Sequence, residues 1–355
     1  MNRSGNARTS VSKERIGIAM SGGVDSTATA LILRENTTVE GFFMRLAQPD
    51  FDRQLARVEN LAEQLNIKLH VVDLRQEFTA KVLEYFASAY FHGTTPNPCM
   101  VCNREVKFGL FQKAILSHGM DRMATGHYAR IVHDSSGYHL HDGLDPAKNQ
   151  SYFLARLTQE QLAKVIFPLG EKRKSEVYAF VAVHGFTDFG GIESQDVCFL
   201  ANESVGSYLE KRYPQAVRGG PVVSTEGVQV GQHTGLFRYT IGQRRGLGIP
   251  DASPWYVTGI DAETNTLIVG KSDELLKTTI RVRDIHWLSG MPPDMDETYS
   301  VRIRYSHRGA IAKLLLVDQS SIHIVFTEPQ RAITPGQFAV IYRGDEVIGS
   351  GVILD

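Results

Sequence analysis

The sequence is short of cysteines, of long apolar runs and of excess charge of either sign. Its 355 residues include three cysteines, Cys99, Cys102 and Cys198. So sparse and odd a set excludes a disulfide scaffold and favours a reducing compartment, so we expect a cytoplasmic protein. No apolar run reaches transmembrane length, and residues 1–14 lack the apolar core of a secretory signal, which predicts a disordered tail. The formal net charge is −1, so a polyanion would have to bind through local basic patches.

A glycine-rich segment, SGGVDS over 21–26, follows an apolar stretch and precedes a helix-like stretch. Strand, tight turn and helix is the context of a phosphate-binding loop, because glycines let the backbone approach a ligand and the first N–H groups of the helix point at an anion. Asp25 would repel phosphates unless a cation bridged them, so the segment also implies Mg²⁺. The Walker pattern and its lysine are missing. A plain Gly-Gly turn is the alternative, and the match of all six residues argues against it.

In the first half of the chain, segments with the apolar pattern of a strand alternate with segments that have the apolar spacing of a helix. Apolar strands are predicted at 16–20, 39–44, 69–74 and 122–126, and helices at 51–65, 78–90 and 105–118. This alternation predicts an α/β fold, a parallel sheet with helices on both faces, with ligands beyond the carboxyl ends of its strands. From about residue 222, short strands separated by glycines predict β structure. We expect a catalytic domain over 15–204, a small β-rich central domain over 205–277 and a C-terminal β-barrel over 278–355.

Two of the cysteines follow a pair of prolines. Cys99 and Cys102 lie in a loop that is expected to run into a helix beginning near Asn103. Thiols just before a helix N-terminus, beside Arg104 and Lys107, should ionise more readily than free thiols.

A CxxC pair is compatible with a zinc half-site, a redox pair or an iron–sulfur half-site, and no second CxxC is present to complete a zinc site. Cys198 taken alone is most typical of a small buried hydrophobe, although the polar run over 193–196 before it is unusual for a core.

Ordered segments along nearly the whole chain carry a resemblance to one family. They are SGGVDS (21–26), TPNPCMVCNREVKF (95–108), ATGHYAR (124–130), FPLG (167–170), ESQDVCF (193–199), YTIGQRRGLGI (239–249), RIRY (302–305) and TPGQ (334–337). Together they resemble the tRNA-specific 2-thiouridylases, whose catalytic domain is a PP-loop, adenine nucleotide alpha hydrolase-like fold.

The resemblance implies ATP-dependent 2-thiolation of the wobble uridine of tRNA. AMP would be transferred to the C2 oxygen, and sulfur from a cysteine persulfide or a cluster-bound sulfide would then replace it. The implied partners are the anticodon loop of tRNA and an upstream persulfide donor protein, with no membrane, and the implied cofactors are ATP and Mg²⁺.

The family's roles carry over by position. Cys102 would be the nucleophile and Cys198 the persulfide carrier. ATP would be bound by Ala19, Met20, Ser21, Gly22, Gly23, Val24, Asp25, Ser26, Met44 and Gly126. Contacts with tRNA would be made by Asn97, Pro98, Cys99, His127, Lys148, Asn149, Gln150, Arg304, Tyr305 and Gln337.

The chain departs from the common family pattern at Cys99, where most members are expected to have Asp. A carboxylate for acid–base chemistry is therefore missing there. Cys99, Cys102 and Cys198 resemble the three cysteines with which other tRNA thiolases hold a [4Fe–4S] cluster with one open iron. The alternative is a thiol-only persulfide relay in which Cys99 is an extra resolving thiol, and the sequence leaves both open.

One basic cluster is interpreted as a contact with RNA and another as ordinary surface charge. Arg302 and Arg304 share a strand parity, so both would face the same side and could contact RNA phosphates. The run Lys172 to Lys174 is interpreted as solvated surface charge.

Two other functions account for these motifs less well. A PP-loop ligase such as an amide-forming synthetase would not need thiols near the loop. A non-catalytic RNA-binding protein with a relict loop would not need SGGVDS intact. Pyrophosphate release that requires tRNA would separate all three.

Overall fold

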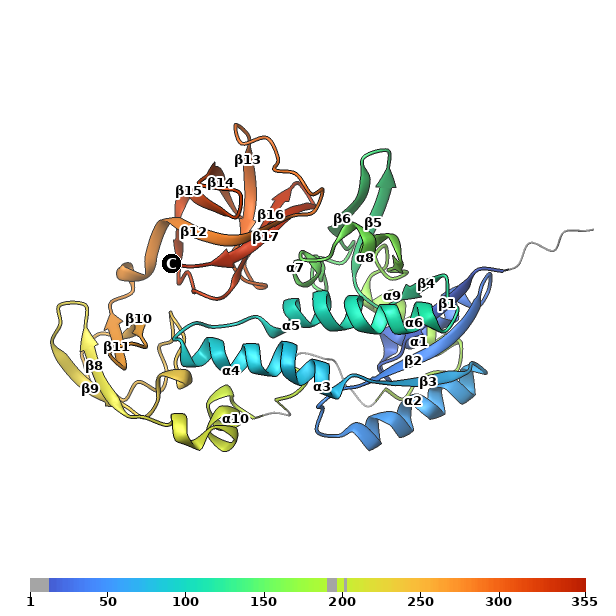
Figure 1. Ribbon diagram of the computed structural model, residues 1–355, viewed down its shortest axis with the longest axis horizontal. Coiled ribbons are helices and arrows are strands. Elements are labelled where there is room, and N and C mark those ends of the chain that lie inside the picture. Colours follow the sequence, from blue (N-terminus) through green and yellow to red (C-terminus); the bar gives the residue numbers. More distant parts are fainter. Residues whose placement is uncertain (1–12, 190–196, 201–202) are drawn as a thin grey trace, which may run out of the picture.

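The computed structural model describes residues 13–189, 197–200 and 203–355 (Figure 1). Most of the predicted N-terminal tail and the run over 193–196 lie outside these residues. At the N-terminal end is a five-stranded sheet in the order β3-β2-β1-β4-β7, with every neighbouring pair parallel. Its strands are β1 (Arg15–Ala19), β2 (Thr38–Arg45), β3 (Leu69–Asp73), β4 (Arg122–Ala124) and β7 (Val165–Ile166). The predicted parallel sheet is confirmed.

Helices cover both faces of this sheet because successive strand residues point to opposite sides. Ile18 and Phe43 pack in one apolar cluster with α1 (Val24–Leu33), α2 (Phe51–Leu65) and α9 (Lys174–Val183). Phe42 and Met123 pack in the other. The helical segments on that side are α3 (Arg75–Phe78), the π-helical stretch η1 (Thr79–Leu83), α4 (Glu84–Phe91), α5 (Pro98–Val101), the π-helical stretch η2 (Cys102–Phe111) and α6 (Gln112–Ser117). The helix expected at 51–65 is confirmed with its bounds.

The C-terminal strands close into an antiparallel barrel. The order is β12-β15-β14-β13-β16-β17, and pairing between β12 and β17 completes the ring. The strands are β12 (Leu276–Trp287), β13 (Thr298–Arg302), β14 (Ala310–Leu316), β15 (Ser321–Arg331), β16 (Phe338–Arg343) and β17 (Glu346–Ile353). Inward residues such as Val301, Leu314 and Ile324 fill it. The predicted barrel is confirmed.

A smaller β-rich region, which comes between these parts in the sequence, lies at the end of α4 that is remote from the parallel sheet (Figure 1). It contains α10 (Val205–Arg212) and a sheet in the order β10-β11-β8-β9. The strands are β8 (Gly220–Ser224), β9 (Gln229–His233), β10 (Tyr256–Asp261) and β11 (Thr266–Gly270). Phe237 contacts Phe91 at the end of α4 with 6.1 Å between ring centroids.

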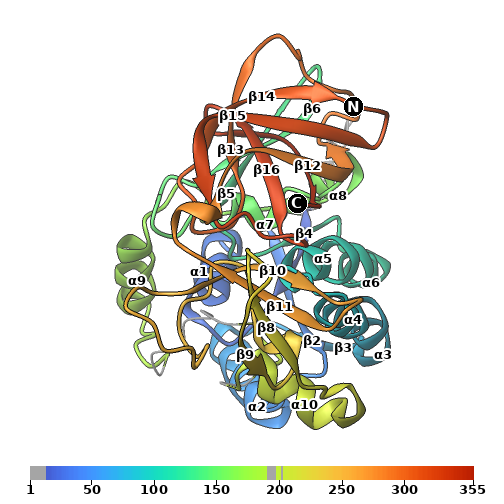
Figure 2. The same cartoon turned by 90° about the vertical axis from the view of Figure 1, so that its left-hand side faces the viewer.

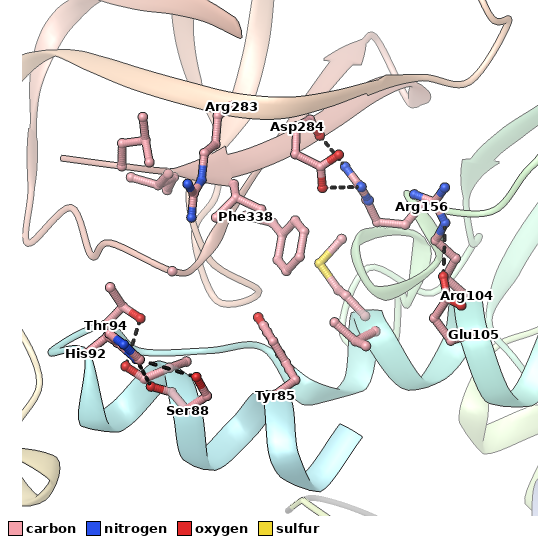
Figure 3. Close-up of a pocket in the computed structure, with 17 residues that line it drawn as sticks. Tyr85, Ser88, His92, Thr94, Arg104, Glu105, Arg156, Arg283, Asp284 and Phe338 are labelled. Carbon is pink, nitrogen blue, oxygen red and sulfur yellow. Dashed lines mark hydrogen bonds and ion pairs between the residues drawn. The ribbon is translucent and has the colours of Figure 1, made fainter. Parts of the chain in front are cut away.

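The barrel is tied to the N-terminal half of the chain. The hairpin of β5 (Ala129–Asp134) and β6 (Gly137–Asp142) extends the barrel sheet beside β17. Arg156, 6% exposed, donates to the Asp284 carboxylate over 2.7 Å and to its carbonyl over 2.6 Å (Figure 3). Below this pair lies a cavity of about 680 Å³ between α4, α5 and the barrel, lined by Tyr85, Met100 and Phe338 among others. The barrel is thereby fixed over the helix that carries Cys99 and Cys102.

No helix in the described part of the chain is both long and apolar enough to cross a bilayer.

Candidate active site

The glycine-rich loop lies at the carboxyl end of β1, as expected for a ligand site in a parallel sheet. Gly22 has φ +79°, a left-handed conformation that glycine adopts without steric cost. The Ser26 and Thr27 hydroxyls both donate to the Gly23 carbonyl, over 3.0 and 3.2 Å. Ser21 Oγ donates to Ser26 Oγ over 3.3 Å. These hydrogen bonds hold the glycine-rich turn against the first turn of α1.

The chain that follows β4 passes directly over this loop at Gly126. A Cβ on Gly126 would lie 2.6 Å from Asp25 Cβ and 2.9 Å from the Asp25 carbonyl carbon, so a side chain there would clash. Met44, near the end of the adjacent strand β2, is half-buried. The predicted ATP residues thus come from neighbouring strand ends and meet at one edge of the sheet.

Asp25 has two partners that the sequence did not reveal. Lys174 Nζ lies 2.8 and 2.7 Å from the two carboxylate oxygens, and Tyr128 Oη donates to Oδ1 over 2.7 Å. The Lys174 side chain is only 11% exposed. Its interpretation as solvated surface charge is therefore wrong, because Lys174 shares the helix face of the buried Val177 and Val181 and points inward with them. That spacing was the available signal.

The loop offers suitable donors for Mg²⁺ with a nucleotide. The Asp25 carboxylate and the Ser21 and Ser26 hydroxyls are hard oxygen groups of the kind this ion takes, and Mg²⁺ is usually held by one or two carboxylates together with substrate phosphates. These residues fit the ion that the sequence implied.

The cysteine-bearing helix begins earlier than expected. It starts at Pro98, and Asn97 is its N-cap, with Oδ1 accepting from the Met100 N–H over 3.2 Å. Proline is favoured at the first helical position because its φ is already helical and its missing N–H is not needed there. The expected start near Asn103 is wrong: Asn103 is buried, and its side chain donates to the Phe153 carbonyl over 3.0 Å.

The thiols are harder to ionise than the sequence suggested. Burial raises the pKa of Cys102 to about 12 and that of Cys99 to about 11. The pKa of Cys198 is raised as well, because surrounding protein displaces water from its thiol even though the residue as a whole is exposed. Lys107 lowers all three pKa values, but loss of water around the thiolates outweighs it, which corrects the expectation of easy ionisation.

The charge of Lys107 lowers the pKa of all three thiols, which indicates that Cys99, Cys102 and Cys198, here called the thiol cluster, lie in the same region of the protein. Cys198 and Cys99 each raise the pKa of Cys102 further, so the thiols also lie close enough to interact. All three are free, and Cys198 is exposed to solvent, which excludes for it the alternative of a small buried hydrophobe.

The thiol cluster does not have the arrangement of a metal site. Within residues 13–189, 197–200 and 203–355, no group of three or more His, Cys, Asp or Glu side chains is placed to hold a metal ion. The described positions of the three cysteines therefore do not fit a [4Fe–4S] cluster.

The thiol pKa values predict an unusual alkylation profile. Iodoacetamide should modify Cys102 at a rate that keeps rising about tenfold per pH unit up to pH 10, whereas an ordinary thiol levels off near pH 9. Lys107→Met should move the profile to higher pH, because the cation that favours the thiolate is removed. Peptide mass spectrometry follows the modified fraction. Lys113→Met, an exposed lysine on α6, is the control, and a plateau below pH 9 in the wild type would contradict the raised pKa.

Several predicted tRNA-contacting residues have internal partners. Gln337 of the barrel donates to the carbonyls of Thr95 and Pro96, over 3.1 Å each. Gln150 Oε1 accepts from the Tyr128 N–H over 3.0 Å, and Asn149 Oδ1 accepts from backbone N–H groups nearby. Gln337, Gln150 and Asn149 therefore shape the loops around Asn97 and Asp25. Pro98 and Asn97 are buried, and the backbone N–H of Lys148 bonds the Asp145 carbonyl.

Two of the predicted tRNA contacts, Tyr305 and Arg304, follow β13 of the barrel. Tyr305, 45% exposed, lies against Phe153 with 4.5 Å between ring centroids. Arg304 is half-buried and donates to the Arg331 carbonyl over 3.3 Å. Arg302 forms an ion pair with Asp142 over 2.6 Å, so its guanidinium already has an anionic partner within the protein, and its contact with RNA stays a prediction.

His127 lies between the loop and the cysteine helix. Its Nδ1 is 2.6 Å from Thr125 Oγ1, and its ring packs beside Phe108 and Phe167. Burial lowers its pKa well below the usual value, so the ring is neutral.

A glycine-rich loop with an aspartate at the carboxyl edge of a parallel sheet, opening a helix that packs on that sheet, is the arrangement of the PP-loop class. Family models match three consecutive regions: a "tRNA methyl transferase HUP domain" at 14–202, a "tRNA methyl transferase PRC-barrel domain" at 206–271 and an "Aminomethyltransferase beta-barrel domain" at 277–353. The chain belongs to the tRNA-specific 2-thiouridylase family, as its motifs indicated.

Close relatives support this membership along the whole chain. The tRNA-specific 2-thiouridylase MnmA of Desulfotalea psychrophila is 52% identical and aligns over 96% of this chain and 99% of its own length. The proteins of the same name from Syntrophomonas wolfei and Desulfosudis oleivorans are 41% and 39% identical, over 96% and 95% of this chain and 99% and 94% of their own lengths.

Proposed function

We propose that the protein, a tRNA uridine sulfurtransferase by family membership, uses ATP to thiolate C2 of the wobble uridine, U34. One observation carries the proposal: the segment 126–128 joins the loop to the cysteine helix. Gly126 packs on Asp25, Tyr128 bonds its carboxylate, and His127 contacts Phe108 on the helix that bears Cys102. An activated nucleotide and a sulfur carrier would therefore meet in one site.

The loop suits the adenylation step. The uridine C2 oxygen is a very poor leaving group, and its attack on the α-phosphorus of ATP converts it to a phosphate ester. The bond from this phosphorus to the bridging oxygen breaks, and pyrophosphate leaves with the electron pair. The first N–H groups of α1 and the hydroxyls of Ser21 and Ser26 face the charge that develops. Mg²⁺, when bound at Asp25, would neutralise phosphate charge.

The thiols suit the second step. A persulfide on exposed Cys198 is accessible to a donor protein. The Cys102 thiolate attacks the Cys198 sulfur, which forms a disulfide and releases hydrosulfide. Hydrosulfide adds to C2, AMP departs, and an external thiol reductant restores both cysteines. The raised pKa of Cys102 makes its deprotonation the demanding part of this step.

Pyrophosphate release tests the proposal. With tRNA, Mg²⁺·ATP and a persulfide donor, the protein should release one pyrophosphate and one AMP for each 2-thiouridine formed at U34, and none without tRNA. Release that is independent of tRNA would favour another PP-loop ligase. An absence of release would favour a binding protein.

We further propose that the protein acts in the cytoplasm. We also propose that its domains span residues 15–204, 205–277 and 278–355.

Binding of tRNA should fall steeply with salt, since phosphate contacts release counterions. Arg304→Ala should reduce the slope of log affinity against log salt by about 1. Tyr305→Ala should weaken binding by about 1–3 kcal/mol through lost stacking and leave the slope unchanged. Filter binding at several salt concentrations measures both. Arg343→Ala, an exposed barrel arginine paired with Glu297, is the control. An unchanged slope for Arg304→Ala would remove Arg304 from the interface.

A further inference from the structure

An ion pair joins the barrel to the β5–β6 hairpin. Arg302, the last residue of β13, donates to both oxygens of the Asp142 carboxylate at the end of β6, over 2.6 and 3.3 Å. Each of the two side chains is only 19% exposed. The central guanidinium carbon of Arg302 lies 4.0 Å from the ring centroid of Tyr342, a fully buried residue of β16. The pair is therefore largely shielded from water at the junction between barrel and hairpin.

The Asp142 carboxylate also accepts a hydrogen bond from Ser151 Oγ. Ser151 is fully buried, and its hydroxyl oxygen lies 3.1 Å from that of Tyr342. It begins α7 (Ser151–Leu154), which lies between the barrel and the helices of the parallel sheet in both views (Figure 1, Figure 2). One carboxylate therefore holds a barrel arginine and the start of α7 in fixed relative positions.

The residue before α7 continues the connection to the phosphate-binding loop. Gln150 forms two hydrogen bonds of 3.0 Å with the Tyr128 backbone, because its side chain accepts from the N–H and its own N–H donates to the carbonyl. Tyr128 in turn donates to Asp25, in the first turn of α1. The barrel arginine and the loop aspartate are thus joined by successive hydrogen bonds and the peptide bond between Gln150 and Ser151.

Stability alone is a weak reason for such a pair. Two charges lose water when they are buried, and their attraction often does no more than offset that loss, so apolar residues of similar size are commonly as stable. An arginine–carboxylate pair does provide direction, because two parallel N–H···O bonds fix the orientation of both groups. Here the two groups come from the barrel and from the hairpin, so the pair fixes the position of one relative to the other.

We propose that the Arg302–Asp142 pair is a positioning pair that holds the RNA-contacting part of the barrel in register with the phosphate-binding loop. The inference rests on the adenylation proposed above, in which the uridine C2 oxygen must reach the α-phosphorus of ATP. Arg304 and Tyr305, the predicted RNA contacts, follow Arg302 directly on the same barrel segment. A misplacement of about 1 Å can slow a reaction about 100-fold. The pair acts through alignment and touches neither substrate.

The kinetics of tRNA-dependent pyrophosphate release test this role. The double variant Arg302→Met/Asp142→Asn removes both charges, so neither is left buried and unpaired. We expect its kcat to fall about 10- to 100-fold, while KM for ATP and the affinity for tRNA stay within about 3-fold of the wild type. Glu346→Gln is the matched control. It breaks a different contact between barrel and hairpin, the 2.6 Å pair with His139, and should keep the wild-type kcat.

Two measurements separate alignment from direct contact with RNA. Each single variant, Arg302→Met or Asp142→Asn, should lose as much kcat as the double variant, because the two residues act as one unit. The slope of log affinity for tRNA against log salt should be unchanged in Arg302→Met, whereas loss of a phosphate contact would lower it by about 1.

Hydrogen exchange measures the connection in the protein without ligands. The Tyr128 N–H, which donates to Gln150, should exchange about 5-fold or more faster in the double variant than in the wild type or Glu346→Gln. Mass spectrometry of peptides covering 126–130 gives the rates. Thermal melting verifies that each variant is folded.

The outcomes are distinct. A lower kcat together with faster exchange over 126–130 supports the inference. An unchanged kcat or unchanged exchange in the double variant, an equal loss in Glu346→Gln, additive losses in the single variants, or a lower salt slope in Arg302→Met would each overturn it. A wild-type protein that releases no pyrophosphate with tRNA would instead overturn the proposed function, and the inference with it.

Discussion

Replacing Asp25 with alanine is expected to reduce tRNA-dependent pyrophosphate release by about 100-fold or more. Asp25 lies in the first turn of α1, and its carboxylate is the group that the loop offers to Mg²⁺, so its loss removes the proposed ligand of the ion. The variant also leaves Lys174 without its Asp25 partner, so the resting charge balance of the loop changes. Affinity for tRNA should change little, because the predicted RNA contacts lie on other elements.

The control for this prediction is Asp52→Ala, which removes an exposed carboxylate from the first turn of the neighbouring helix α2. It should release pyrophosphate at the wild-type rate. A pyrophosphate assay and filter binding of tRNA, on the same preparations, give both quantities. Thiolation by Asp25→Ala near the wild-type level would remove the loop from the reaction.

The parts of the fold that the sequence predicted are those set by local pattern. The strand around Ile16 and the helix over 51–65 follow from apolar spacing within one element, so neighbouring residues suffice to find them. The glycine-rich loop could be predicted because its six residues are contiguous in the sequence. Its strand–turn–helix setting is contiguous as well.

The parts that the sequence missed depend on contacts between distant segments. Lys174 meets Asp25 from 149 residues away, and beside Lys172 and Arg173 it resembles surface charge. The prediction that the thiols ionise readily was wrong for a related reason. The sequence shows the helix and Lys107, which lower a thiol pKa, but the burial that outweighs both comes from tertiary packing. Arg302 likewise resembles a free cation for RNA phosphates in the sequence, whereas in the structure it pairs with Asp142 of the β5–β6 hairpin.

Loss of Cys102 or Cys198 is expected to separate the two chemical steps. Cys102→Ser and Cys198→Ser should lower 2-thiouridine formation by about 1,000-fold or more, because no relay can release sulfur without both thiols. Pyrophosphate release should persist in both, since Asp25 and its loop are untouched. Mass spectrometry of digested tRNA and a pyrophosphate assay measure the two steps in parallel.

Cys99 distinguishes the two sulfur mechanisms. In the thiol relay, Cys99→Asp should stay within about 10-fold of the wild type. It should be somewhat slower, because a carboxylate near Cys102 raises the pKa of that thiol further. Aerobically purified, iron-free protein should then thiolate tRNA from a persulfide donor. If instead the wild type lost its activity with its iron, and Cys99→Asp lost both together, the cysteines would be cluster ligands, in an arrangement that the described structure does not show.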